Sequence, residues 1–142
     1  MQKNKLKQIA TILALLVGLA LVAGCRNEQD LTEAKSVAAK VHAHLLSREF
    51  AAIYEESAPG FKLSGSQLDF VSQMKRLDEV LGPLKSTNEM AYKTGLDSTT
   101  GRTYALLYKL EYEHGKAYEN LVMVRSNNGQ MLLSKLEIQP AE

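Results

Sequence analysis

The spacing of apolar residues changes once along the chain, and the change separates a helical part from a strand part. Apolar side chains recur every three or four positions between residues 31 and 45 and again between residues 68 and 81, which predicts two helices that each bury one face. Beyond Gly82 apolar residues alternate with polar ones, as is typical of strands with one buried face. Helices followed by strands indicate an α+β domain.

Residues that favour helix ends mark the limits of both helices. Asp30 with Glu33 has the spacing of a capping box, and so has Ser66 with Asp69. Each pair is therefore expected at the start of a helix. Gly82, which a proline follows, should end the second of these helices.

A shorter helical stretch between the two brings the expected number of helices to about three. Residues 50–54 place three apolar side chains on one helix face, and Pro59 with Gly60 should end this stretch. Phe61 and Leu63 are then expected to anchor a turn.

About four strands are expected after Gly82, in a curved antiparallel sheet. Residues 84–94 are polar and suit an edge strand, whereas residues 104–112 alternate strictly. Two further strands should cover residues 116–125 and 130–138. The side chains expected on one face of the second strand are Tyr104, Leu106, Tyr108, Leu110 and Tyr112.

The first hairpin signal places an acid among these tyrosines. His114-Gly115 indicates a tight turn, which would pair Glu119 with Leu110 and put Glu119 on the tyrosine face. Glu119 is then either a partly buried acid or a residue at the rim of the sheet. A buried acid there would be a candidate functional group.

The second hairpin signal allows two registers. A two-residue turn at Asn128-Gly129 would pair Arg125 with Leu132, whereas a three-residue loop with a left-handed Gly129 would pair Arg125 with Met131. We favour the loop, because it keeps the apolar residues of both strands on one face.

The first 25 residues carry a different pattern. Three lysines precede an apolar run over residues 9–23, and Cys25, the only cysteine, follows it. The sequence Val22-Ala23-Gly24-Cys25 resembles the signal of bacterial lipoproteins. That resemblance implies cleavage between Gly24 and Cys25 and attachment of a diacylglycerol to the Cys25 sulfur.

Two other interpretations of this segment are weaker. A membrane-spanning helix needs about 20 apolar residues, and this run has 15. An ordinary cleaved signal would leave an unpaired thiol in an oxidising compartment, which exported proteins usually avoid. We therefore expect an exported protein anchored to the membrane by lipid. By resemblance to lipoprotein sorting signals, Arg26 after the cysteine implies the periplasmic face of the outer membrane in a Gram-negative cell.

The rest of the chain has the length of one domain, and its charge excludes one class of partner. We expect a signal peptide at residues 1–24, a lipidated tether at 25–30 and a single domain at 31–142. Three of the 17 basic residues and none of the 16 acidic ones lie in the signal peptide, so the mature protein has a formal charge of −2. Without a basic excess, nucleic acid is not an expected partner.

The order of elements resembles that of the cone-shaped nuclear transport factor 2-like domains, which have a cystatin-like arrangement of helices on a curved sheet. Residues 104–108, Glu119 and residues 128–133 are similar to a group of small exported bacterial domains of unknown function, over residues 37–138. Met131 stands where that group usually has a tryptophan. The resemblance implies a fold and no particular activity.

The same resemblance implies a pocket. Such cones can hold a small apolar ligand between helices and sheet, and related enzymes place a carboxylate beside a tyrosine there. The candidate pocket residues in this chain are Tyr54, Tyr104, Tyr108 and Glu119. A row of tyrosines at strand spacing is more often core packing with hydroxyls at the rim.

The sequence carries few other signals of metal binding or catalysis. His42 and His44 lie about 200° apart around a helix, so they cannot chelate one ion, and we expect both to be solvated. His114 is expected in a turn. No nucleophile elbow and no phosphate-binding glycine loop can be recognised, so no metal, cofactor or catalytic residue is assigned.

Two functions of different class remain. We favour a non-catalytic lipoprotein module that binds the membrane through its anchor and a small apolar ligand, a peptide or an envelope protein through its domain. The alternative is a lipid-anchored enzyme that uses Glu119 with a tyrosine for proton transfer. An open apolar cavity reaching Glu119 would favour the enzyme. The polar first strand, as a sheet edge, also suggests a homodimer.

Overall fold

The computed structural model describes residues 28–141, and the chain divides into two compact units, Met1–Thr32 and Glu33–Glu142. Of the first unit only residues 28–32 are described, and they are helical. The expected signal peptide at residues 1–24, its cleavage site at Gly24 and the lipidation site at Cys25 lie outside the described residues. The sheet and the helices that pack on it belong to the larger unit.

Helices and a four-stranded antiparallel sheet make up the described residues, which confirms the α+β class. The four helices span residues 28–47, Phe50–Glu56 (α2), Pro59–Lys62 (α3) and Gln67–Leu81 (α4). The strands lie side by side in chain order and span Leu84–Asp97 (β1), Gly101–Tyr112 (β2), Gly115–Arg125 (β3) and Met131–Pro140 (β4).

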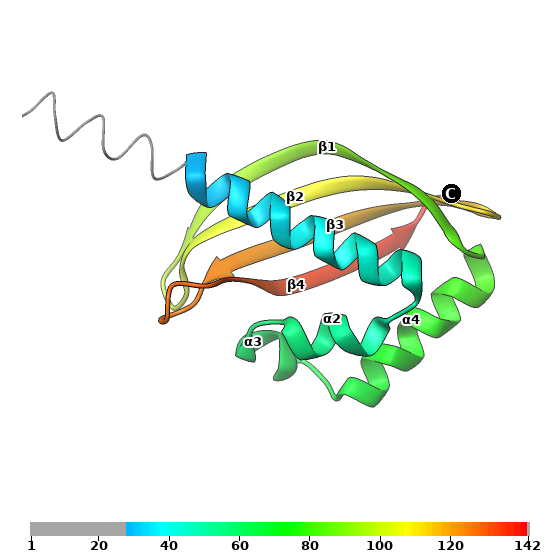
Figure 1. Cartoon of the computed structure of the whole chain (residues 1–142), viewed down its shortest axis with the longest axis horizontal. Helices are drawn as coiled ribbons and strands as arrows, with labels where there is room; N and C mark the ends of the chain where they lie inside the picture. The colour runs from blue at the N-terminus through cyan, green and yellow to red at the C-terminus, as the bar shows by residue number, and fades with distance from the viewer. Residues whose placement is uncertain (1–27, 142) are drawn as a thin grey trace, which may run out of the picture. The chain divides into compact units, whose positions relative to one another are not determined.

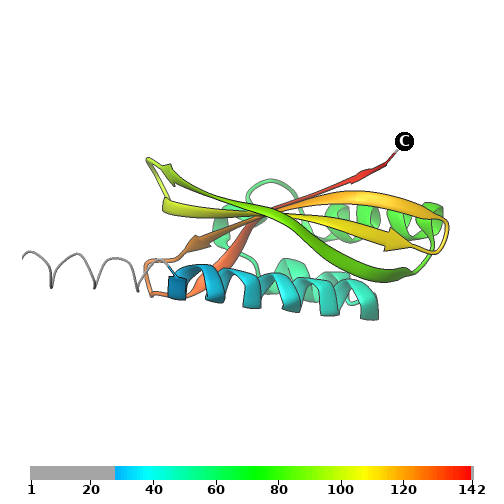
Figure 2. The ribbon, with the colours of Figure 1, turned by 90° about the horizontal axis from the view of Figure 1, so that it is seen from above.

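Helix residues 33–47 lie along one face of the curved sheet, as Figures 1 and 2 show from two directions. α2 and α3 lie beside the β4 edge (Figure 1). The Ala58 N–H, just before α3, donates a hydrogen bond of 2.8 Å to the Leu133 carbonyl on β4. This bond fixes the start of α3 against the sheet edge.

The core forms where two predicted apolar faces meet. All five alternating side chains of β2 are buried, from Tyr104 to Tyr112. The first helix buries its own row at steps of three and four, as its sequence predicts. Its core side chains in the larger unit are Ala34, Ala38, Val41 and Leu45.

The helix limits are partly as expected. Ser66 caps α4 as predicted, because its hydroxyl accepts a hydrogen bond from the Asp69 N–H at 3.1 Å. Asp30 was expected to cap the first helix, but it lies inside the helix of residues 28–47. Pro59 does not end a helix and instead starts α3, because the first residue of a helix needs no N–H donor.

Two leucines are also placed differently from expectation. Leu63, expected to anchor the turn after the second helical stretch, is 88 % exposed. Leu68, part of the apolar row of α4, is 76 % exposed. Phe61 is the residue that packs at this turn, since its ring lies against those of Tyr54 and Phe70.

One hairpin has the predicted register and the other is shifted by two residues. Arg125 pairs with Met131 and Gly129 has a φ of 85°, which confirms the three-residue loop. The first turn is formed by Glu113-His114 rather than His114-Gly115, so Glu119 pairs with Tyr108 and not with Leu110. A shift of two keeps every side chain on its face, and Glu119 therefore still shares the tyrosine face.

Candidate functional site

Glu119 is completely buried on the inner face of β3. Its Oε2 lies 2.5 Å from Nε2 of His42 on the first helix, so one proton joins the two side chains in a hydrogen bond. Its other carboxyl oxygen, Oε1, is buried without a hydrogen-bond partner. A half-satisfied buried carboxyl group is costly to keep, because an unpaired polar atom loses its hydration without replacement.

His42 was expected to be solvated, and that expectation was wrong. It is only 7 % exposed, because it follows Ala38 by four residues and precedes Leu45 by three, and therefore shares their face of the helix. Its ring and that of Tyr108 pack edge to face, with the ring centroids 4.5 Å apart. The helical spacing could have revealed this position, but its carboxylate partner comes from a strand 77 residues later.

The surroundings of Glu119 keep two tyrosines protonated. Burial, followed by the charges of Glu89 and Glu119, raises the pKa of Tyr108 from 10.0 to about 12. Burial also raises the pKa of Tyr112 well above its ordinary value, and the charge of Glu119 adds to this effect. Both hydroxyls therefore stay protonated up to a higher pH than the hydroxyl of an exposed tyrosine.

The structure brings three of the four expected pocket residues to one face. Tyr108 lies directly opposite Glu119 in the sheet, and Tyr104 is buried four residues earlier on the same face of β2. Tyr54 is not part of this cluster. It lies on α2, where its hydroxyl donates a hydrogen bond of 2.9 Å to the Gly65 carbonyl.

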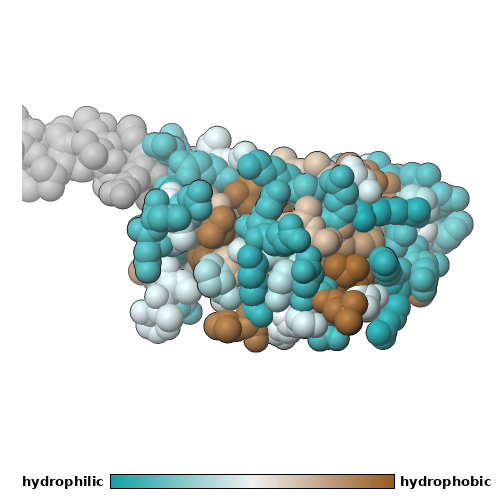
Figure 3. Space-filling model, turned by 60° about the horizontal axis from the view of Figure 1, so that its bottom comes forward, coloured by the Kyte–Doolittle hydropathy of each residue, from teal (hydrophilic) through white to brown (hydrophobic). Residues whose placement is uncertain are grey.

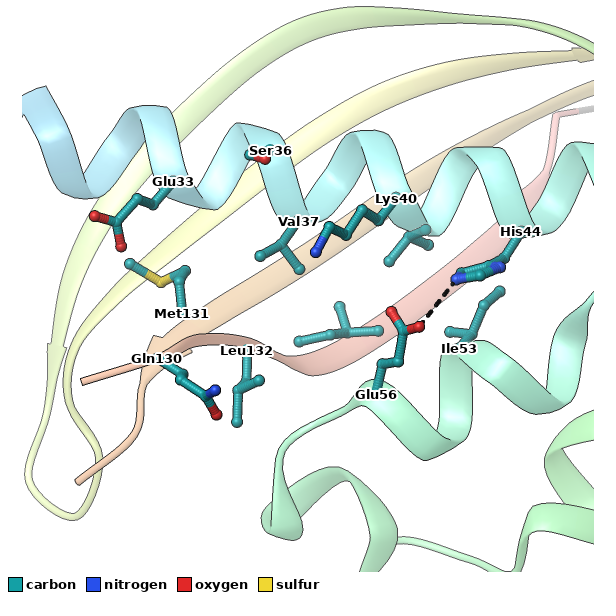
Figure 4. A pocket seen from close by; sticks show the side chains of 12 residues that line it. Glu33, Ser36, Val37, Lys40, His44, Ile53, Glu56, Gln130, Met131 and Leu132 are labelled. Atoms are coloured by element: carbon teal, nitrogen blue, oxygen red, sulfur yellow. Dashed lines mark ion pairs between the residues drawn. The ribbon is translucent and has the colours of Figure 1, made fainter. Parts of the chain in front are cut away.

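A groove lies elsewhere, between the first helix, α2 and the start of β4. Its volume is about 460 Å³. Its lining residues on the first helix are Glu33, Ser36, Val37, Lys40, Val41 and His44. Those on α2 are Ile53 and Glu56, and those at the start of β4 are Met131, Leu132 and Leu133, with Gln130 just before the strand. Figure 4 shows these side chains converging from the three elements.

A smaller groove of about 260 Å³ lies between α3, α4 and β4. The rings of Tyr54, Phe61 and Phe70 form one wall. Neither groove is lined by His42, Tyr108 or Glu119. The buried cluster and the open surfaces are thus separate features.

Among residues 28–141 neither a metal-binding cluster nor a membrane-spanning helix is found. Among these residues no group of three or more histidine, cysteine or acidic side chains is arranged to hold a metal ion. In the same range no helix combines the length and apolar character needed to span a bilayer.

Comparison with known proteins adds no assignment to these observations. No protein-family model and no curated protein matches this sequence.

Proposed function

We propose that this chain is a lipid-anchored module of the bacterial cell envelope that binds a ligand or partner without transforming it. The anchor is inferred from Val22-Ala23-Gly24-Cys25 at the end of the apolar run. Several acyl chains hold a protein firmly at a membrane, whereas one chain holds it only reversibly. Arg26 after the cysteine supports the periplasmic face of the outer membrane, if the cell has one.

The non-catalytic part of this proposal rests on the position of Glu119, which is buried in the core and lines neither groove. Glu119, the only completely buried acid among the described residues, contacts His42 inside the core, while the larger groove is lined by other side chains. A proton-transfer enzyme needs its acid or base within reach of bound substrate. We therefore interpret Glu119 and His42 as a structural pair.

The finer fold assignment is also a proposal. Helices before a curved four-stranded meander, with one helix along the sheet, support a domain of the nuclear transport factor 2-like type. That assignment concerns architecture, and many activities share one architecture.

One observation favours the enzyme alternative. Glu119 Oε1 has no partner and lies in the same cluster as His42 and Tyr108, which are residue types that transfer protons. A substrate would have to open the core to reach them. If a small apolar compound shifts the NMR signals of the His42 ring at saturation, the enzyme alternative gains support; unchanged ring signals support the binding module.

Mass spectrometry of the N-terminus tests the anchor. The protein purified from its own cells should begin at Cys25 and carry the mass of a diacylglycerol with added acyl groups. Cys25→Ser should prevent acylation of the protein. Gly24→Ala, which keeps a small residue before the cysteine, should leave acylation intact. A free Cys25 thiol, or a different first residue, would refute the anchor.

A further inference from the structure

The larger groove has an apolar floor and follows the first helix. Val41, Ile53, Met131 and Leu133 in this floor are at most 7 % exposed. Lining residues run from Glu33 to His44, which is about 17 Å of helix at 1.5 Å per residue. The volume of about 460 Å³ lies within the range of small-molecule sites. An elongated apolar ligand fits this form.

The rim of the groove carries one positive charge, Lys40, that has no partner among the described residues. Glu33 is held by Arg125 at 2.7 Å, and His44 lies 3.4 Å from Glu56. Lys40 has no ion pair or hydrogen bond with any described residue. Figure 4 shows its amine extending along the groove toward Val37.

The positive charge has a polar neighbour on the same helix face. Ser36 lines the groove four residues before Lys40, and residues four apart are neighbours on a helix surface. A hydroxyl and one ammonium group can together donate hydrogen bonds to a single carboxylate. Glu33 is paired with Arg125, and Glu56 lies against the imidazole of His44, so Lys40 is the rim charge available to a ligand, and its positive charge favours an anionic group.

We propose that this groove binds a single-chain alkyl carboxylate, with its chain on the floor and its carboxylate at Lys40 and Ser36. A peptide is disfavoured, because its backbone N–H and C=O groups would lie on a floor without polar partners. On the face shown in Figure 3, apolar residues form separate patches among hydrophilic ones. A broad protein interface would need a more continuous apolar surface. This inference specifies the ligand of the proposed binding module and does not depend on the lipid anchor.

Methionine methyl groups report on binding directly. Met131 lies on the groove floor, whereas Met123 is buried in the core and Met90 is exposed on β1. The full chain, labelled with ¹³C at its methionine methyls and placed in phosphatidylcholine nanodiscs, is titrated with decanoate below its micelle concentration. We expect a saturable shift of the Met131 signal and constant Met123 and Met90 signals. Decyltrimethylammonium, with the same chain and the opposite charge, should bind more weakly.

Three variants test the assigned roles. Lys40→Gln should weaken decanoate binding about threefold to fivefold, which is the usual effect of one solvent-accessible ion pair. Lys75→Gln, an equal charge change at an exposed residue of α4 outside the groove, should leave binding unchanged. Val37→Phe places a ring in the groove and should abolish the saturable shift of Met131.

Two outcomes would overturn the proposal. One is an unshifted Met131 signal in the wild-type protein, and the other is equal binding of the carboxylate and the ammonium compound. The titration reports ligand binding in the groove, and mass spectrometry reports acylation of Cys25. Either inference can therefore fail while the other stands.

Discussion

At the residue scale, the stability of the core should depend strongly on the pair of His42 and Glu119. His42→Ala leaves both carboxyl oxygens of a completely buried residue without a partner. We expect a loss of about 3–5 kcal/mol in the free energy of unfolding, as for other buried pairs that lose one member. Glu119→Gln keeps the shape and can still hydrogen-bond His42, so its cost should be smaller. Urea denaturation measures both values.

His44→Ala is the matched control. His44 lies two residues away on the same helix, but its polar contacts with Glu49 and Glu56 are at the surface. Such pairs contribute at most about 1 kcal/mol. Equal effects of His42→Ala and His44→Ala would show that the buried pair has no special structural role.

Tyr108 should make the fold sensitive to alkaline pH. Its pKa is raised by burial and by nearby carboxylates from 10.0 to about 12. Between these values the unfolded chain has lost the Tyr108 proton and the folded chain keeps it, so rising pH favours unfolding. The free energy of unfolding, measured in urea from pH 8 to pH 11, should fall as the pH passes 10. Tyr108→Phe should flatten this fall, and an unchanged slope would contradict the assignment.

At the scale of elements, Gly82 permits the tight connection between α4 and β1. Its φ is 76°, and a Cβ at this position would lie 2.9 Å from Cδ2 of the His114 ring. Gly82→Ala should therefore cost about 1–3 kcal/mol, the usual range for a strained backbone position. Gly60→Ala on α3 is the control, because its Cβ would meet nothing within 4 Å. A thermal unfolding scan compares them, and equal midpoints would contradict the role given to Gly82.

The elements were predictable where the pattern is local. The alternation in β2, the Ser66 cap and the Gly129 loop each follow from a few neighbouring residues, and each is confirmed. The prediction that Pro59 ends a helix was wrong. Proline is common both just after a helix and at its first position, and which of the two applies depends on whether the residues after the proline form a helix. The exposure of Leu68 depends on how α4 packs, which helical spacing alone does not determine.

The candidate site was less predictable than the elements. Glu119 was placed on the correct face, but its partner is a histidine on a distant helix, and Tyr54 lies elsewhere. The groove beside Lys40 requires three elements from separate parts of the sequence to come together. Periodicity identifies buried faces, whereas a concave surface arises only from their packing.

At the scale of the whole molecule, we expect β1 to mediate a weak dimer. β1 is an edge strand of 14 residues, and exposed apolar side chains on it include Met90, Tyr92 and Leu96. Its pairing with β2 is irregular near Lys85 and near Met90, which leaves residues 91–97 as a regular stretch. An exposed regular edge is a template for another strand, and each charge added to it beyond Lys93 and Asp97 weakens pairing.

Sedimentation velocity of the protein in nanodiscs, at increasing concentration, measures this association. Wild-type particles should shift toward twice the mass of a single protein-loaded nanodisc, and Leu96→Lys should reduce the shift, because it adds a second lysine, beside Lys93, to the shared edge. Leu63→Lys adds the same charge to a leucine that is equally exposed but lies after α3, and it should dimerise like wild type. A wild-type protein that stays monomeric at every concentration would refute the dimer and leave the β1 edge unpaired, with the irregularities at Lys85 and Met90 as the features that keep it so.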